Sequence, residues 1–190
     1  MNAIKQTVSL QRLSEYDLQV CFLFNYPVRR PLVKRFFQVI SRLGDGMFWY
    51  LLLVLFPLFD DMPGLGVTLH MLAVGLVSTL LYKGLKQYSA RERPYVTHTI
   101  IELGADPLDR FSFPSGHTLH AVGFTAVVLF YYPVLAWLLL PFTLLVMASR
   151  MVLGLHYPSD VLMGMVIGLT VAVSSFEFLP DAIEQLFTLL

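Results

Sequence analysis

The sequence predicts an all-α helical bundle embedded in a membrane, with about five to six transmembrane helices and an amphipathic N-terminal segment. Three observations support this fold class. Hydrophobic residues make up 56% of the 190 positions. Charged residues make up only 14%, whereas about 25% is usual in soluble domains. The chain also contains long stretches with almost no charge, and a soluble domain would need more polar residues to cover its surface.

The uncharged stretches locate the predicted spans, because a helix needs about 20 apolar residues to cross the hydrocarbon core. Residues 62–82 are long enough for one span. Residues 112–149 are long enough for two, with a reversal at Tyr132-Pro133. A further span is predicted at 158–178, and the shorter stretch 46–59 crosses if it is tilted.

Residues 1–45 are predicted to form an amphipathic segment on the membrane surface. The apolar stretch 18–28 is too short to cross and is followed by basic residues. A helix in this segment would insert four apolar side chains, those of Phe36, Phe37, Val39 and Ile40. An alternative with six spans, in which residues 18–40 cross, stays open.

The whole chain, 1–190, is predicted to form a single membrane domain with its helical bundle at 46–178. It contains no internal repeat, low-complexity tract or linker, and residues 1–15 lack the apolar core of a signal peptide. The formal net charge of zero excludes a nucleic-acid binder held by basic patches. The single cysteine, Cys21, excludes an intrachain disulfide and a CxxC site.

Polar residues gather in three clusters at predicted span ends, where ionisable side chains of so apolar a chain are candidates for function. The first cluster comprises Lys86, Arg91, Arg93 and Pro94, the second is the segment 114–117, and the third comprises Ser149, Arg150, His156 and Asp160. The second span brings the chain to one face of the membrane, the third leaves that face and the fourth returns to it. All three clusters are therefore expected to meet on one face.

The cations of these clusters predict a phosphate site. Lys86, Arg93 and Arg150 around one small volume require an anion, and arginine forks match phosphate oxygens. Ser115 and Gly116 at a helix start add a hydroxyl group and backbone N–H groups.

Two histidines and one carboxylate supply the groups for catalysis. Pro158 suits the first turn of a helix, so Asp160 would lie in that turn and lean toward His156. A carboxylate on one imidazole nitrogen leaves the other nitrogen free as a nucleophile. His117 would supply a proton to the leaving oxygen. The sequence has no carboxylate cluster for a metal, and we expect neither a metal nor another cofactor.

In order and spacing, eleven positions resemble the three-part signature of the type-2 phosphatidic acid phosphatase superfamily, which includes the vanadium-dependent haloperoxidases and glucose-6-phosphatase. They are Lys86, Arg93, Pro94, Pro114, Ser115, Gly116, His117, Ser149, Arg150, His156 and Asp160. The matching motifs span residues 86–160. With the predicted helices on either side, the chain resembles the membrane branch of that superfamily.

The resemblance implies a role for each matching residue. His156 would attack phosphorus and form a phosphohistidine, and Asp160 would orient it. His117 would protonate the leaving group and later activate water. The phosphoryl oxygens would be bound by Lys86, Arg93, Ser115, Gly116 and Arg150. Members of the superfamily hydrolyse phosphate esters without a metal.

A site at span ends, near lipid headgroups, favours a substrate whose tail stays in the bilayer. The expected activity is hydrolysis of the terminal phosphate of a lipid phosphate or diphosphate, of the phosphatidate, phosphatidylglycerophosphate or undecaprenyl diphosphate class. Two alternatives stay open: a phosphatase for a water-soluble sugar phosphate, and an anion-binding membrane protein without turnover. Membrane lipids are the other expected partners, no nucleic acid is expected, and protein partners stay unknown.

The remaining polar residues are predicted to be structural. Lys83, Arg91 and Arg110 are interpreted as surface anchors, and Asp106 and Asp109 as solvated loop charges. His70 is expected to bond between helices, and His120 to pack or bond behind the site. Gly164 and Gly168 form a GxxxG pattern typical of close helix packing.

The expected location is the cell membrane, in a bacterial inner membrane, but the side of the site stays open. Residues 1–45 carry seven basic residues and the turns 60–63 and 131–134 carry none. With five spans, the positive-inside rule indicates a cytoplasmic site. Bacterial relatives commonly place this site on the periplasmic face, which would require a sixth crossing.

Overall fold

The protein is all-helical in the computed structural model, which describes residues 2–189, with side chains from residue 14 onward. The helices are α1 (Asn2–Asn25), α2 (Pro31–Arg42), α3 (Phe48–Ser89), α4 (Pro94–Thr97), α5 (Gly116–Tyr131), α6 (Ala136–Val152), α7 (Pro158–Ser175) and α8 (Leu179–Thr188). A π turn, Leu43–Met47, joins α2 to α3. No strand occurs among the described residues, which confirms the all-α prediction.

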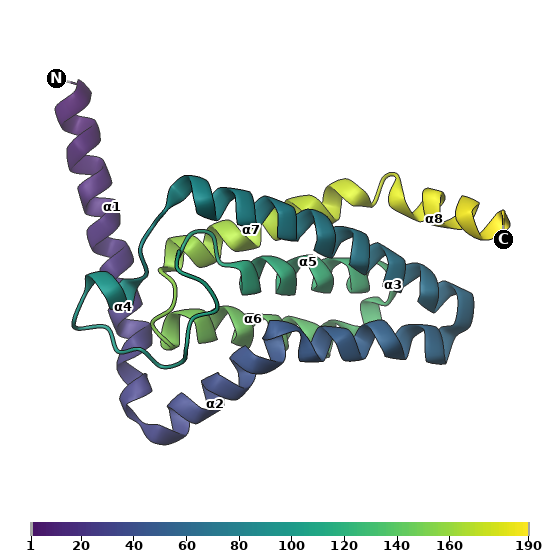
Figure 1. Ribbon diagram of the computed structural model, residues 1–190, viewed down its shortest axis with the longest axis horizontal. Coiled ribbons are helices and arrows are strands. Elements are labelled where there is room, and N and C mark those ends of the chain that lie inside the picture. Colours follow the sequence, from purple (N-terminus) through teal and green to yellow (C-terminus); the bar gives the residue numbers. More distant parts are fainter. Residues whose placement is uncertain (1, 190) are drawn as a thin grey trace.

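The longest helix, α3, is a hairpin. Its backbone leaves helical geometry at Asp60 and Asp61, so that residues 48–59 and 62–89 form two antiparallel arms (Figure 1). Gly64 allows the arms to meet, because a Cβ atom there would lie 2.0 Å from the carbonyl oxygen of Phe56. We call residues 48–59 the first arm and residues 62–89 the second arm.

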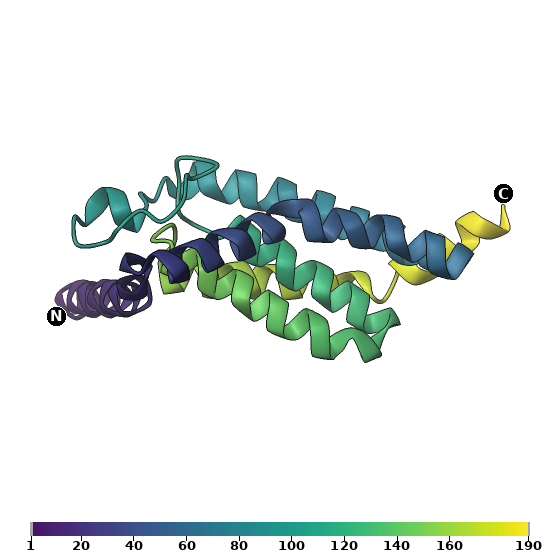
Figure 2. The same cartoon turned by 90° about the horizontal axis from the view of Figure 1, so that it is seen from below.

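Five lengths of helix run along the long axis of the molecule: the two arms of α3, α5, α6 and α7 (Figures 1 and 2). By length and composition, three segments are apolar enough to cross a membrane, namely Pro31–Thr97, Pro133–Val152 and Pro158–Ser175, and α5 is a shorter apolar helix. The first segment contains the α3 hairpin and therefore passes twice. The reversal predicted at Tyr132-Pro133 is present, because α5 ends at Tyr131.

The N-terminal residues divide between two positions. Helix α1 lies across the ends of the bundle helices rather than along them (Figures 1 and 2), as a surface segment would. Helix α2 differs from the prediction, because it packs along α6 and leads directly into the first arm. Phe37 and Ile40 pack against protein clusters, while Phe36 and Val39 stay exposed. Part of the apolar face of α2 thus packs on protein, and part of it stays exposed.

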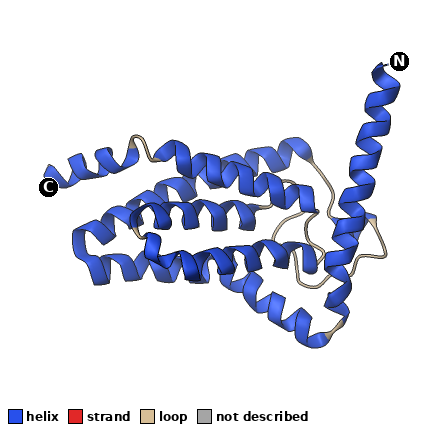
Figure 3. Ribbon diagram, turned by 180° about the vertical axis from the view of Figure 1, so that it is seen from behind, coloured by secondary structure: helices blue, strands red, loops and turns tan. Residues whose placement is uncertain are grey.

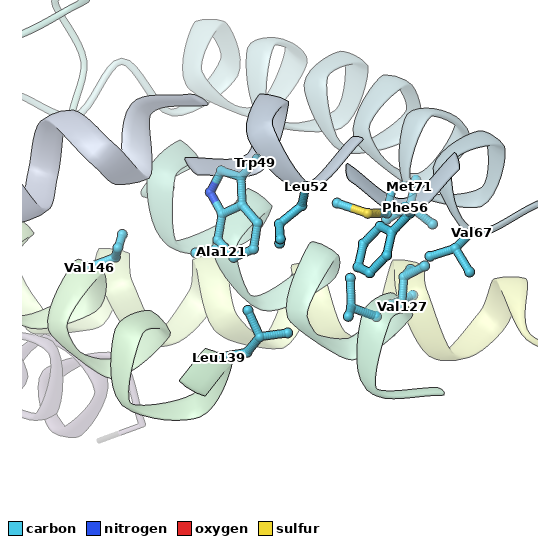
Figure 4. Packing of buried hydrophobic residues seen from close by; sticks show 12 residues of the cluster. Trp49, Leu52, Phe56, Val67, Met71, Ala121, Val127, Leu139 and Val146 are labelled. Carbon is cyan, nitrogen blue, oxygen red and sulfur yellow. The ribbon is translucent and has the colours of Figure 1, made fainter. Parts of the chain in front are cut away.

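The main core fills the space between the first arm, the second arm, α5 and α6 (Figure 4). Its buried side chains include Trp49, Leu52, Phe56, Val67, Met71, Ala121, Val127, Leu139 and Val146. Packing of this kind fixes the helices in one arrangement and therefore fixes the helix ends that carry the polar clusters.

Helices α5 and α7 touch backbone to backbone through the GxxxG pattern. A Cβ atom on Gly164 would lie 2.6 Å from the carbonyl oxygen of Ser115, and one on Gly168 would lie 2.3 Å from that of Leu119. The predicted close packing is therefore confirmed. The contact also brings the start of α7 to the start of α5, where the Ser115 N–H donates to the Asp160 carbonyl oxygen at 3.1 Å.

The buried His70 and the partly buried His120 bond to neighbouring elements, as predicted. The His70 ring contacts the Tyr131 hydroxyl at 2.9 Å and the Ser175 hydroxyl at 2.7 Å. His120 contacts the Thr79 hydroxyl at 3.0 Å. The irregular segment 98–115, drawn as a long loop in Figure 3, covers the end of the bundle that also carries α1.

Candidate active site

The structure brings all three polar clusters to one end of the bundle. Six of the eight predicted site residues line one cavity of about 850 Å³ there: Lys86, Arg93, Gly116, His117, Arg150 and His156. The other two, Ser115 and Asp160, are fully buried behind its wall. The order of the predicted spans had placed the three clusters on one face. In the structure, the helix ends that carry them lie at the same end of the bundle (Figure 1).

His156 lies in the turn between α6 and α7, next to the guanidinium group of Arg93. The distance from Arg93 Nη1 to His156 Nε2 is 3.3 Å, and Nη1 also donates to the Leu155 carbonyl oxygen at 2.7 Å. Burial, together with the nearby positive charges of Arg150 and Arg93, holds the pKa of His156 well below its usual value. The imidazole is therefore neutral and has a free nitrogen lone pair at physiological pH.

Asp160 lies near His156, but the orienting hydrogen bond is not closed. His156 Nδ1 is 3.7 Å from Asp160 Oδ2 and has no hydrogen-bond partner among the described residues. The carboxylate is held instead by the Ser112 hydroxyl, by the Tyr157 N–H at 2.8 Å and by Arg91 at 2.6 Å. Three donors fix the carboxylate beside the imidazole.

Arg91 forms an ion pair with the buried Asp160, so its interpretation as a surface anchor is wrong. One guanidinium nitrogen donates to Asp160, and the other forms an ion pair with Asp17 of α1 at 2.7 Å. The guanidinium carbon lies 4.1 Å from the ring centre of Tyr157. Arg91 lies two residues before Arg93, within the first motif, and this position was the signal in the sequence.

Asp109 stays exposed, as a solvated loop charge would, but it is also an ion-pair partner of two predicted phosphate ligands, which the sequence did not predict. Its oxygens lie 2.6 Å from Lys86 Nζ and 2.8 Å from Arg93 Nη2. Burial pushes the pKa of Asp109 upward, but Lys86 and Arg93 outweigh burial and hold it below its usual value. Lys83 and Arg110, interpreted as surface anchors, and Asp106, interpreted as a solvated loop charge, are exposed.

The remaining predicted residues lie on the α2 side of the cavity. His117 Nε2 is 3.3 Å from Asp45 Oδ1, in the π turn before α3. Arg150 is buried and donates to the Ser41 hydroxyl, and its Nε atom has no partner among the described residues. Neither Asp45 nor Ser41 was predicted, because each comes from the segment 1–45 that was expected to lie on the surface.

The second cluster forms the start of α5. Ser115 is the N-cap residue of α5, and its hydroxyl accepts from Thr118 at 3.0 Å instead of capping the helix. Gly116 lines the cavity with its backbone. Among the described residues, no group of three or more His, Cys, Asp or Glu side chains is arranged to hold a metal ion.

Chemically, the arrangement combines a neutral imidazole, a fixed carboxylate beside it, a second imidazole and three cations around one cavity. Such a set suits a tetrahedral anion whose central atom is attacked by nitrogen and whose charge is offset by the cations. These are the requirements of phosphoryl transfer.

Comparison with known proteins gives the same family. The model of the PAP2 superfamily matches residues 65–184. The undecaprenyl-diphosphatase BcrC of Bacillus subtilis is 38% identical over 86 residues, which are 45% of this chain and 44% of that relative. The match therefore spans less than half of that protein.

Two solved structures resemble the whole bundle. LpxE of Aquifex aeolicus aligns with a TM-score of 0.70 at 27% identity, over 85% of this chain and 94% of that one. A transmembrane PAP2-type phosphatidylglycerolphosphate phosphatase of Bacillus subtilis aligns with a TM-score of 0.66 at 26% identity, over 93% and 87%. The superfamily match covers more than half of the chain, including every predicted site residue, and the apolar helices match transmembrane structures. The chain therefore belongs to the PAP2 superfamily and is a membrane protein with that superfamily's helical fold.

Proposed function

We propose that the protein is a membrane phosphatase that hydrolyses the terminal phosphate of a lipid phosphate or diphosphate through a phosphohistidine on His156. The observation that carries the proposal is the position of His156 Nε2. This unprotonated nitrogen lies 3.3 Å from Arg93, in a cavity that Lys86 and Arg150 also line. A phosphoryl group held by these cations would present its phosphorus to that nitrogen.

The first step forms a bond between His156 Nε2 and phosphorus while the bond from phosphorus to the leaving oxygen breaks. His117 gives that oxygen its proton, and the cations offset the charge on the other oxygens. The imidazole becomes positively charged in this step. Asp160 then gains a stronger attraction for His156 Nδ1–H, which favours closing the 3.7 Å separation.

The second step hydrolyses the phosphohistidine. Water forms a bond to phosphorus, its proton goes to His117, and the electron pair of the P–N bond returns to His156 Nε2. Inorganic phosphate is released and both histidines return to their starting states. This chain's own residues supply every proton transfer.

The shape of the cavity supports a lipid substrate. Beyond the cations, it continues between the two arms of α3, where its lining includes Leu53, Leu72 and Leu76. Leu72 and Leu76 are half exposed or more on the outer face of the second arm, which faces lipid if the bundle crosses a membrane. An acyl or prenyl chain could therefore remain in the bilayer while its phosphate reaches His156.

The relatives favour the same class. Their names are undecaprenyl-diphosphatase and phosphatidylglycerolphosphate phosphatase, so one is named for a diphosphate and the other for a monoester. The cations bind only the terminal phosphoryl group in our proposal, and both kinds of substrate present one.

The test is phosphate release by the purified protein in lipid nanodiscs, with chelator present. Phosphatidate, phosphatidylglycerophosphate and undecaprenyl diphosphate are compared with their tail-less headgroups. We expect hydrolysis of at least one lipid, weak hydrolysis of its headgroup, and acid-labile, alkali-stable phosphate on the protein. His156→Ala should lose about a thousandfold or more in kcat, the scale of a lost nucleophile.

The matched control is His98→Ala, which removes a loop histidine that lines neither the cavity nor its entrance and should keep full activity. Equal activity of His156→Ala and the original protein would disprove the proposed nucleophile. Preference for the tail-less headgroup would instead favour a sugar phosphatase, and phosphate binding without turnover would favour an anion-binding protein.

A further inference from the structure

A second cavity, of about 480 Å³, adjoins the site at Asp45, Leu108, His117 and Arg150. It lies between α2 and the 98–115 loop, and Gln38 joins these walls by donating to the Gly104 carbonyl oxygen at 2.7 Å. Its lining is mainly polar: Lys34, Gln38, Ser41, Arg42, Asp45, Leu103, Gly104, Ala105, Asp106, Leu108, His117 and Arg150. No leucine of the α3 arms contributes to it, in contrast to the first cavity.

The two cavities meet at the predicted acid–base residue. Asp45, Leu108, His117 and Arg150 line both of them, so these side chains form the boundary between the cavities. His117 therefore faces the lipid side and the polar side together. This position fits its two tasks, because it first gives a proton to a lipid oxygen and later takes one from water.

The charges of the second cavity suit a small anion. Arg42 is exposed and Lys34 half-buried, and neither forms an ion pair among the described side chains. At the inner end, Arg150 is buried with its Nε atom unpartnered. Asp45 and Asp106 also line the cavity, but Asp45 is engaged with His117. Cations thus mark both ends of a path from the surface to the phosphoryl site.

We propose that the second cavity is the route by which water enters the phosphoryl site and inorganic phosphate leaves it, while lipid enters and leaves only through the first cavity. This inference rests on the proposed function. It assigns the two half-reactions to two entrances. The lipid is dephosphorylated through the first cavity. Water then enters through the second cavity and hydrolyses the phosphohistidine, and the phosphate formed leaves through the same second cavity.

Reversal of the second half-reaction provides a test that needs no lipid. Inorganic phosphate that enters from solution forms phosphohistidine and water, so repeated reversal exchanges phosphate oxygens with ¹⁸O-labelled water. Ala105→Trp places a large side chain in the wall of the second cavity. Leu72→Trp does the same in the first cavity, and Leu72 does not line the second.

We expect Ala105→Trp to slow oxygen exchange and steady-state turnover about tenfold, while the initial burst of dephosphorylated lipid keeps its rate, because burst kinetics separate the first half-reaction from the second. Leu72→Trp should slow the burst and leave the exchange unchanged. Ile100→Trp, in the same loop as Ala105 but outside both cavities, should behave like the original protein in both assays.

A milder substitution tests the second cavity independently, so that the test does not depend on the folding of Ala105→Trp. Lys34→Gln keeps the side chain polar and removes one cation of the second cavity, and it should raise the Ki for inorganic phosphate about threefold or more, since one charge contact is lost. Its lipid burst should not change.

Two results would overturn the two-entrance proposal: Ala105→Trp and Leu72→Trp slowing both assays equally, or Ala105→Trp slowing neither. If the original protein hydrolyses lipid phosphate but shows no burst and no exchange, the phosphohistidine fails, and with it the two half-reactions that this inference requires. If it hydrolyses no lipid phosphate, the proposed function itself fails.

Discussion

Asp160 shows how a single buried carboxylate is supported by residues from distant parts of the chain. It is fully buried, and its oxygens accept from Ser112 in the loop, from the backbone of Tyr157 and from Arg91. Arg91 is in turn paired with Asp17 of α1. A buried carboxylate is costly unless it is paired, so the ion pair with Arg91 favours the charged form of Asp160 and holds it beside His156.

We therefore predict that Arg91→Ala lowers kcat about tenfold or more, a loss of about 1.4 kcal/mol of transition-state stabilisation, with a smaller change in KM. The substitution leaves Asp160 without its cation, and its carboxylate turns away or gains a proton. Steady-state kinetics on a lipid phosphate measure the split between kcat and KM.

Arg29→Ala is the matched control for this prediction. Arg29 forms an ion pair with Glu102 on the surface, where both side chains are about half exposed. Such pairs contribute about 0–1 kcal/mol, so kcat should not change. Equal kinetics for Arg91→Ala and Arg29→Ala would show that Arg91 does not position Asp160.

At this scale, the sequence predicts the motif residues but not their partners. The cations and histidines could be found because their types suit one chemistry and helix parity brings them together. Asp109, Asp45 and Asp17 could not, because each reaches the site from an irregular segment or from α1. Their contacts depend on how the loop folds and on how α1 is placed, and no sequence periodicity reports either.

At the scale of elements, the contact between α5 and α7 positions two of the three clusters. Ser115 begins α5 and Asp160 lies in the first turn of α7, and the backbones of the two helices touch at Gly164 and Gly168. Small residues at a helix interface allow such an approach. The site therefore depends on glycines more than a helical turn away from it.

We predict that Gly168→Ala destabilises the protein, because its Cβ atom would lie 2.3 Å from the carbonyl oxygen of Leu119 and the helices must separate. We expect a loss of about 1–3 kcal/mol, the usual cost of overpacking. Thermal unfolding in detergent measures it, and activity should fall as α5 and α7 shift.

The control is Gly84→Ala, in the second arm of α3, where nothing lies within 4 Å of the new Cβ atom. Alanine is favoured over glycine within helices by about 1 kcal/mol, so this variant should be neutral or stabilising. Similar melting temperatures for the two variants would contradict the close-packing interpretation.

The sequence predicts most of these elements, because long apolar stretches and prolines mark helices strongly. It does not predict the role of α2. Its amphipathic pattern suits a membrane surface and a protein surface equally, and only the presence of α6 beside it decides between them.

For the molecule as a whole, the charges are separated along the bundle axis. Every lysine and arginine lies in α1, in α2, or near the site end of the bundle: Lys5, Arg12, Arg29, Arg30, Lys34, Arg35, Arg42, Lys83, Lys86, Arg91, Arg93, Arg110 and Arg150. The hairpin turn of α3 and the chain after α7 carry only acidic charges, those of Asp60, Asp61, Glu177, Asp181 and Glu184. Five helical passages also place the C-terminus at the end opposite the site (Figure 1).

The positive-inside rule therefore predicts a cytoplasmic site and a C-terminus on the outer face. The excess of basic residues at the site end remains even when Lys86, Arg93 and Arg150, which are expected to bind phosphate, are left out of the count. A fusion of alkaline phosphatase after Leu190 should be active, and a fusion of green fluorescent protein there should be dark.

A loop cysteine provides the complementary measurement. Asp106→Cys, in a Cys21→Ser background, should resist a membrane-impermeant maleimide in intact cells. The reverse pattern in both experiments would place the site on the outer face. Labelling that puts residue 106 and the C-terminus on the same face would contradict the three passages, α5, α6 and α7, that separate them.

Asp109 has a further consequence for turnover. Its carboxylate already binds Lys86 and Arg93, and a phosphoryl group bound as we propose would need the same two side chains. The Asp109 carboxylate therefore competes with the substrate for these two cations, and because it is part of the same chain its effective concentration is high. Because the Asp109 carboxylate binds again whenever Lys86 and Arg93 become free, it weakens the binding of the phosphate product as well as that of the substrate. This competition limits inhibition of the enzyme by its own product.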